Sequence, residues 1–248
     1  MSLDQILEIG KETIKIAYGS SRVELRSHKC RFQITPNRYL EFARKELITA
    51  GGDSQKINVM GHLKRALDCQ VETFFDYLGI LDSARKSLRS AKTKFEYLGI
   101  LGGISSSSVE RLIAIRNKME HEFSVPDISE LQAYYDLIQA YVVLFKRMST
   151  FPSEILFTSP HNSWKYCLNE NGEISIFQGS MDDDENFIAD ENKSTLIKFT
   201  NDSKGYILGL VIMDSLNRKW LGVSDDSDEV TVIEEAFTKI SELNLRGG

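Results

Sequence analysis

The chain has 248 residues, of which 42% are hydrophobic and 27% are charged, and its formal net charge is −6. This balance is typical of a globular protein with enough apolar material for two or three small cores. No apolar run reaches the roughly 18–20 residues of a membrane-spanning helix, which excludes that class of protein. Three widely spaced cysteines argue against a disulfide framework and against a zinc site. The first residues lack the pattern of a secretory signal, so we expect a cytoplasmic protein that does not contact the membrane.

The charge is unevenly distributed along the chain. Residues 1–150 carry 22 Lys and Arg against 18 Asp and Glu, whereas residues 151–248 carry 8 against 18. Such an asymmetry favours contact of any polyanion with the first part of the chain, although ordinary variation of the surface explains it as well.

Residues 1–52 are expected to form a mixed segment of helix and strand. A helix from Leu3 to Ala17 precedes an alternating stretch at residues 22–26. A second helix begins at Thr35-Pro36, with proline at its first position, and runs to Ile48. Glycines 51 and 52 then mark a boundary.

Residues 53–150 are expected to form four amphipathic helices with short connections. Helix starts are indicated by Asp82, by the S-x-x-E pattern at Ser107, and by Asp127 with Glu130, which repeats that capping logic. Four such helices bury their apolar stripes best against one another, so a central four-helix bundle is predicted. The stripes of the first, second and fourth helices are Met60, Leu63, Leu67, Val71, Phe74 and Leu78; Ala84, Leu88, Ala91 and Phe95; and Leu131, Tyr134, Ile138, Tyr141, Phe145 and Met148.

Two similar stretches, Phe75 to Leu81 and Phe95 to Leu101, each contain the tripeptide Leu-Gly-Ile. We interpret both as helix ends, where glycine permits a left-handed cap.

Residues 151–248 are expected to form a small, acidic, β-rich α+β domain. Predicted strands lie at residues 154–157, 164–168, 173–177, 196–199 and 206–213, and a closing helix at 230–243. The fold class is therefore a multidomain α+β protein in which the bundle is followed by this smaller domain. The acidic loop Asp182 to Glu185 lacks the spacing of a calcium loop, so a solvated or partner-facing loop is favoured over a cation site.

A polar set of residues interrupts the apolar stripe of the third helix. Arg116 lies in the middle of that stripe, Asn117 follows it, and His121 comes one turn after Asn117. The arginine fork matches phosphate oxygens, and histidine exchanges a proton near neutral pH. Cleavage of RNA without a metal needs a base for the ribose hydroxyl and a cation for the charged transition state.

The run Arg116-Asn117-Lys118-Met119-Glu120-His121 resembles the R-x4–6-H signature of HEPN domains, including the polar residue after the arginine. The resemblance covers about residues 54–149. HEPN domains are bundles of four to five helices, and many are metal-independent ribonucleases of toxin–antitoxin, phage-defence and CRISPR-associated systems. Their catalytic site typically forms where two motifs face each other in a dimer.

The resemblance implies a homodimeric endoribonuclease that uses no cofactor or metal and has RNA and an antitoxin or regulatory protein as partners. His121 would act as general base or acid, Arg116 would bind the scissile phosphate, and Asn117 would orient the substrate. In members that are silenced by a nucleotidyltransferase, a tyrosine stands two residues beyond the histidine. Phe123 occupies that position here, so silencing by that route is not expected.

Other interpretations of these residues stay open. Arg116 and His121 could be structural, with Arg116 paired to Glu120, or the domain could be a catalytically inactive HEPN-like module for dimerisation, RNA binding or protein interaction. A basic stripe on the second helix, with Lys118 near the motif, could follow an RNA backbone, although a solvated face is the more frequent case. The members of that stripe are Arg85, Arg89 and Lys92. No phosphate-binding, dinucleotide, zinc-protease or serine-hydrolase motif is present.

Overall fold

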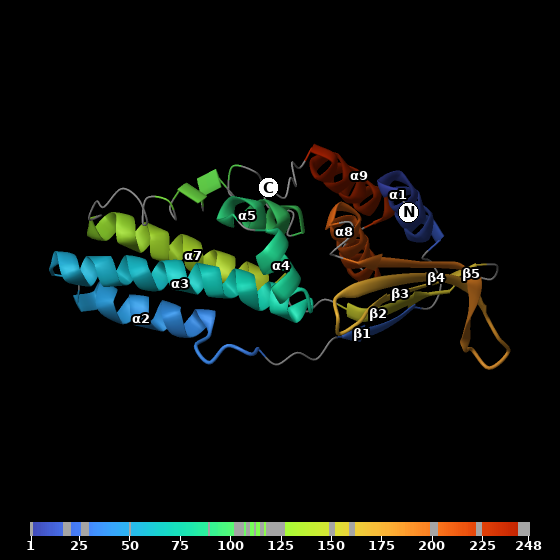
Figure 1. The fold of residues 1–248 in the computed structure, drawn as a ribbon, viewed down its shortest axis with the longest axis horizontal. Coiled ribbons are helices and arrows are strands. Elements are labelled where there is room, and N and C mark those ends of the chain that lie inside the picture. Colours follow the sequence, from blue (N-terminus) through green and yellow to red (C-terminus); the bar gives the residue numbers. More distant parts are fainter. Residues whose placement is uncertain are drawn as a thin grey trace. The chain divides into compact units, whose positions relative to one another are not determined.

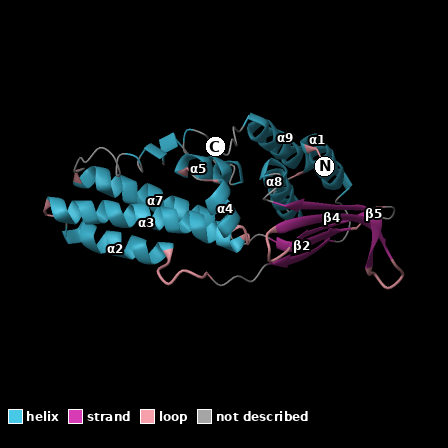
Figure 2. Ribbon diagram, in the orientation of Figure 1, coloured by secondary structure: helices cyan, strands magenta, loops and turns pink. Residues whose placement is uncertain are grey.

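The fold is taken from a computed structural model of the chain. It describes residues 2–16, 21–25, 30–49, 51–88, 90–101, 127–148, 152–158, 162–198, 203–221 and 225–242, together with six single positions between 107 and 117. These residues form eight helices and one five-stranded antiparallel sheet, which makes this an α+β protein (Figures 1 and 2).

The chain divides into two compact units that do not follow the order of the sequence. One unit, the sheet unit, contains residues 1–27, 78–87 and 150–248. The other, the helical unit, contains residues 28–77 and 88–149. The segment expected as a separate N-terminal region, residues 1–52, is thus shared between the two units.

The helical unit contains α2 (Pro36–Thr49), α3 (Asp53–Tyr77), α5 (Ala91–Leu101) and α7 (Ile128–Met148). Helix α3 is the longest of them and packs against α2, α5 and α7. The stripe expected on this helix is confirmed, because Met60, Leu63, Leu67 and Phe74 are all buried. Helix α2 begins at Pro36 as expected, since the ring of proline suits the first helical position.

The sheet unit is a meander of β1 (Ser21–Leu25), β2 (Pro152–Phe157), β3 (Ser163–Leu168), β4 (Glu173–Met181) and β5 (Phe187–Lys198), hydrogen-bonded in that order. Helices α1 (Leu3–Ile16), α8 (Ser203–Trp220) and α9 (Asp226–Glu242) lie on one face of it (Figure 1). Helix α8 contacts the sheet, and α1 and α9 pack on α8 and on each other. A buried hydrogen bond of 2.7 Å between the hydroxyls of Thr13 and Tyr166 ties α1 to β3.

The expected strand at residues 206–213 is wrong, because these residues lie inside α8. The residues from Tyr206 to Met213 are buried on every side of α8, because the sheet packs against one side of this helix and α1 and α9 pack against the others. A continuous apolar run is typical both of a buried strand and of a fully enclosed helix, and periodicity does not separate the two.

The second helix expected in the bundle is also wrong, because it is broken into α4 (Leu81–Ser87) and α5. The hydroxyl of Ser90 accepts a hydrogen bond of 3.0 Å from the amide of Thr93 and caps the start of α5. The stripe positions therefore do not share one helix, since Ala84 lies on α4 in the sheet unit, whereas Ala91 and Phe95 lie on α5 in the helical unit.

The two Leu-Gly-Ile tripeptides adopt different structures. Gly79 follows α3 with φ of 77°, as expected of a left-handed cap, and lies against the turn that joins β3 to β4. Gly99 is part of α5, so the interpretation of this second glycine as a helix end is wrong. The same three residues therefore end a helix in one place and continue one in the other.

The hairpin turns after β3 and β4 have the same construction. In the first, the side chain of Asn169 accepts the amide of Asn171 and Gly172 has a φ of 70°. In the second, the carboxylate of Asp182 accepts the amides of Asp184 and Asn186, and the residue with positive φ, at 61°, is Glu185. Glycine is the residue that adopts this conformation without strain, so only the first turn has the favoured residue there.

Candidate functional site

The segment between α5 and α7 carries the residues to which the sequence assigns catalysis. Asn117 is helical and its side chain is exposed. Arg116, Lys118 and His121 lie outside the described residues. The structure thus places one of the three expected catalytic residues. The other described positions in this part of the chain are each helical, and they are Ser107, Glu110, Arg111, Ile113 and Ala114.

Hydrogen bonds at the start of α7 fix the point where this segment ends. The carboxylate of Asp127 accepts the amide of Glu130 at 2.7 Å, and the carboxylate of Glu130 accepts the amide of Asp127 at 3.3 Å. This reciprocal capping box is the one expected from the sequence. Hydrogen bonds from the Ser129 hydroxyl and from the Glu130 amide lower the pKa of Asp127, so its carboxylate keeps the charge that suits a helix N-terminus.

Side chains of α3, α5 and α7 form much of the core of the helical unit. The rings of Phe75 on α3 and Tyr97 on α5 meet edge to face, with centroids 6.0 Å apart, and both are buried. From α7, Leu131, Ile138 and Phe145 are buried as their stripe predicts. Helix α3 thus packs against both α5 and α7, the described helices that come before and after Asn117 in the sequence.

The basic stripe expected on one helix comes from two. Arg85 lies on α4 and Lys92 on α5, and both are exposed, whereas Arg89 lies outside the described residues. The ammonium of Lys92 lies 3.7 Å from the carboxylate of Glu96, a surface ion pair of small energetic value. The break between α4 and α5 is the physical reason that these residues do not share one helical face.

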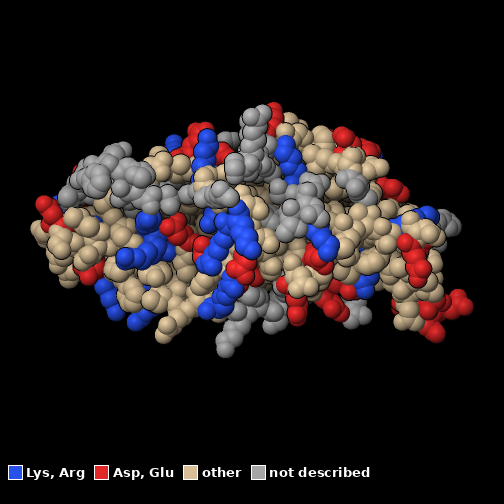
Figure 3. Space-filling model, viewed as in Figure 1, with Lys and Arg blue, Asp and Glu red and all other residues tan. Residues whose placement is uncertain are grey.

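The acidic loop between β4 and β5 is a turn that is closed by hydrogen bonds to the side chain of Asp182. One oxygen of the Asp182 carboxylate accepts two main-chain amides, and the hydrogen bond from Asn186 is the main cause of the lowered pKa of this carboxyl. Among the residues that the structure describes, no three His, Cys, Asp or Glu side chains are grouped as ligands of a metal ion. Figure 3 shows acidic side chains gathered where Figure 1 draws this hairpin tip.

Sequence reasoning missed a cleft of about 390 Å³ in the sheet unit, next to the middle of β5. Inside it the amide of Gln178 donates a hydrogen bond of 2.8 Å to the side-chain oxygen of Asn162. The Lys193 ammonium and the Asp190 carboxylate, 3.5 Å apart, form a charged pair at the same site. Ser180, Ala189 and Ile188 complete much of the lining.

The cleft exists because the ladder between β4 and β5 is interrupted. Gly179 pairs with Ala189 and Phe177 with Ser194, so residues 190–193 leave the ladder opposite Gln178. A methyl group at Gly179 would collide with the main chain of Ile188, whose carbonyl carbon would be 2.9 Å away. A glycine inside a strand is the signal that could have predicted this irregularity.

Comparison of the chain with protein-family models, with curated proteins and with solved structures finds no match. Within the described ranges, no helix has the length and apolar character to cross a membrane. The fold and these local sites therefore define the protein as an α+β protein of two units.

Proposed function

We propose that this protein is a metal-independent endoribonuclease of the HEPN type that acts as a homodimer in the cytoplasm, in a toxin–antitoxin or phage-defence system. The observation that carries the proposal is the Arg116-Asn117 pair followed by His121, in the segment that joins α5 to α7 of the helical unit. Support for the proposal comes from the helical, exposed Asn117 and from the packing of α5 and α7 against α3.

The proposed chemistry divides the work among three side chains. His121 removes the proton of the ribose 2′-hydroxyl or protonates the leaving oxygen, and Arg116 neutralises charge on the scissile phosphate. Asn117 orients the substrate through hydrogen bonds. The products are a 2′,3′-cyclic phosphate and a 5′-hydroxyl.

The proposal is tested by incubating the full chain with total RNA and with transfer RNA in excess EDTA. Wild type is expected to cleave, whereas Arg116→Ala and His121→Ala are expected to lose about 10² to 10⁴-fold in rate, the usual contribution of an acid–base group. Arg111→Ala is the matched control, because Arg111 is a helical, exposed arginine that lies five residues before the motif. Its activity is expected to equal that of wild type.

Two outcomes would overturn the proposal. Intact RNA in every lane would favour the inactive HEPN-like interaction module over the enzyme. Equal losses in Arg111→Ala and Arg116→Ala would mean that general positive charge, and not the motif, produces the activity.

A further inference from the structure

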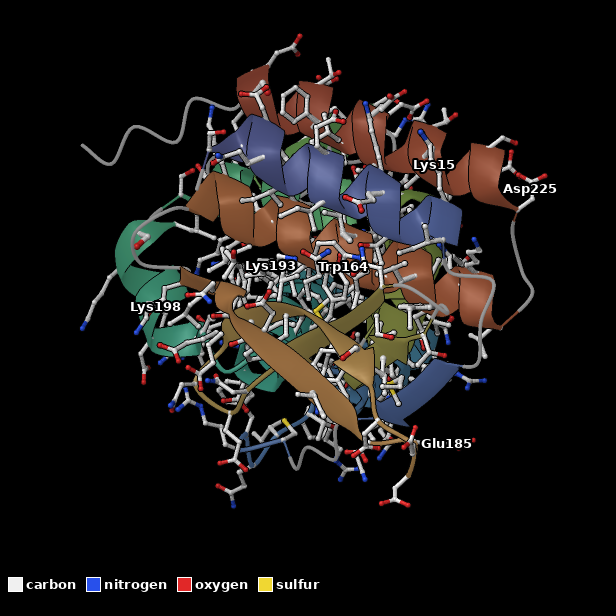
Figure 4. The ribbon with its side chains drawn as sticks, turned by 90° about the vertical axis from the view of Figure 1, so that its right-hand side faces the viewer. Lys15, Trp164, Glu185, Lys193, Lys198 and Asp225 are labelled. Carbon is white, nitrogen blue, oxygen red and sulfur yellow. The ribbon has the colours of Figure 1, made fainter. Side chains whose placement is uncertain are left out.

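The outer edge of the sheet at β5 has no strand beside it among the described residues. Strand β5 is twelve residues long and hydrogen-bonds only to β4, whereas β1, at the opposite edge, has five residues. The main-chain groups on the outer side of an edge strand are a template for another extended chain. Figure 4 shows β5 from the side, with Glu185 in the hairpin tip before the strand and Lys198 at its far end. A chain that pairs with this edge has to match both its shape and its charge.

The interruption of β5 changes the way in which its side chains alternate between the two faces of the sheet. Ala189 pairs with Gly179, and Ser194 pairs with Phe177. Because Gly179 and Phe177 are two residues apart on β4, all four of these positions lie on the same face. In an uninterrupted strand, two residues five positions apart lie on opposite faces. A regular strand therefore cannot match the alternation of β5 on both sides of residues 190–193.

A second copy of this chain has the same interruption and does match it. A two-fold axis perpendicular to the sheet makes the two β5 strands antiparallel and keeps each residue on its own face. With the axis between residues 191 and 192, residues 187–189 of each copy lie opposite residues 196–194 of the other, and the two interruptions lie opposite each other. Residues that face each other in an antiparallel pair lie on the same face, and every pair of these two ladders satisfies that condition.

The charges of β5 are complementary in this register. The strand has no net charge, because its charged residues are Asp190, Glu191, Lys193 and Lys198. Asp190 of each copy comes opposite Lys193 of the other, which gives two ion pairs across the axis. Glu185, in the hairpin tip of one copy, comes near Lys198 of the other, whose ammonium also lies 2.6 Å from Glu173 of its own chain. A neutral strand favours neither a polyanion nor a strongly basic segment, whereas these pairs favour an identical strand.

The ion pair within one chain does not compete strongly with those between copies. The ammonium of Lys193 lies 3.5 Å from the carboxylate of Asp190, and the two side chains are 56% and 37% exposed. Such a surface pair contributes little to stability. Both charged groups are therefore accessible to a second copy.

Apolar side chains also face each other in this register. Leu196 is 52% exposed and comes opposite the half-buried Phe187 of the other copy. On the other face, Ile188 is 55% exposed and comes opposite Thr195. Pairs of an aromatic with an aliphatic side chain, and of two β-branched side chains, are among those that stabilise neighbouring strands.

We propose that the outer edge of β5 is an interface between two copies of this chain, whose β5 strands pair antiparallel about a two-fold axis between residues 191 and 192 and join the two sheets into one. This inference goes beyond the proposed function, which requires two copies but does not specify this surface. It needs no ribonuclease activity, because the edge belongs to the sheet unit. Its test is the oligomeric state and not the cleavage of RNA, so the two proposals can fail separately.

The oligomeric state of the full chain is measured by sedimentation velocity over a series of concentrations up to about 100 μM, at an ionic strength of about 0.15 M. Wild type is expected to form a dimer. Asp190→Lys makes both members of each intermolecular pair basic, and Lys193→Asp makes both acidic. Each variant by itself is therefore expected to raise the dissociation constant of the dimer about tenfold or more.

An equimolar mixture of the two variants separates contacts between copies from the contact within one copy. In a mixed dimer the basic pair of one copy faces the acidic pair of the other, so both intermolecular ion pairs are restored. The contact within each chain stays between like charges. The mixture is thus expected to dimerise with a dissociation constant close to that of wild type. Glu235→Lys is the matched control, because Glu235 forms a comparable surface pair of 3.8 Å with Lys239 on α9, and it is expected to dimerise like wild type.

Hydrogen exchange measures the proposed interface directly. The amides of β5 are expected to become more protected as the concentration of wild type rises, and those of Asp190→Lys to become protected only when Lys193→Asp is added. Circular dichroism checks that each variant is folded.

A wild type that is monomeric at every concentration would overturn the proposal. So would a dimer that Asp190→Lys and Lys193→Asp leave intact, a mixture of the two variants that stays monomeric, or equal weakening by Glu235→Lys. A dimer that both variants leave intact would still suit an interface in the helical unit. A dimer through β5 that cleaves no RNA would count against the ribonuclease alone.

Discussion

Replacement of Gly79 by alanine is expected to destabilise the sheet unit through two separate effects. Gly79 has a φ of 77°, and an L-residue with a side chain loses about 1–2 kcal/mol in that region. Its new methyl group would also collide with the carbonyl oxygen of Glu170 and lie 2.9 Å from the amide nitrogen of Gly172. Moving main chain to relieve such overpacking costs about 1–3 kcal/mol.

One effect opposes these two. Alanine restricts the unfolded chain more than glycine does, which stabilises the fold by about 0.4–1 kcal/mol. The net expectation for Gly79→Ala is a decrease of about 1–4.5 kcal/mol in the free energy of unfolding, measured by urea denaturation followed by circular dichroism. Asparagine tolerates positive φ, so Gly79→Asn should recover about 1 kcal/mol of this loss and remain destabilised by its contact with the turn.

The control is Gly61→Ala in α3, where the nearest atom to the added methyl group is Nη1 of Arg65 at 3.8 Å. With helical dihedrals and sufficient space, this variant should gain about 0.5–1 kcal/mol. A Gly79→Asn variant that is as stable as wild type would refute the argument that contact of the new side chain with main chain destabilises the fold. A neutral Gly79→Ala would refute both parts of the reasoning.

Two further predictions concern a buried hydrogen bond and two half-buried thiols. The Thr13 hydroxyl donates a hydrogen bond of 2.8 Å to the carbonyl of Ile9 and therefore accepts one from the Tyr166 hydroxyl. Tyr166→Phe should lower the free energy of unfolding, measured by urea denaturation, by about 1 kcal/mol. If the loss is unchanged in a Thr13→Val background, the hydrogen bond contributes nothing. Burial raises the pKa of the Cys69 and Cys167 thiols to about 11, so alkylation near pH 8 should be much slower in the folded than in the urea-unfolded chain. These folded-state pKa values exceed the ordinary value of 9.0, so the contribution of the two protonated thiols to the stability of the fold is complete below pH 9 and is lost between about pH 9 and 11. A urea midpoint that rises over this pH range would contradict the raised pKa values.

The sequence predicted the helices whose signals are local and independent of their neighbours. The reciprocal cap at Asp127 and Glu130 and the proline at residue 36 define helix starts through hydrogen bonds and dihedrals within a few residues. The periodic stripe of α3 predicted its buried face, because a period of 3.6 residues places those side chains on one side of any helix. The HEPN-type motif is likewise a sequence observation, and it stays a prediction.

The sequence did not determine features that depend on distant partners. Leu-Gly-Ile ends a helix at Gly79, where the β3–β4 turn meets the chain, and continues a helix at Gly99, so the tripeptide alone does not specify the backbone. The cleft at Gln178 was missed for a related reason, since its walls come from strands whose register is set by pairing and not by local preference.

What the sequence by itself determined is the α+β class, the starts of α2 and α7, the buried face of α3 and the acidic character of residues after 150. Tertiary structure alone decided that β1 pairs with β2 across more than a hundred residues, because an isolated alternating stretch carries no information about its partner. It also decided that residues 206–213 are helical, because only enclosure by the sheet, α1 and α9 gives an apolar run buried surroundings on every side.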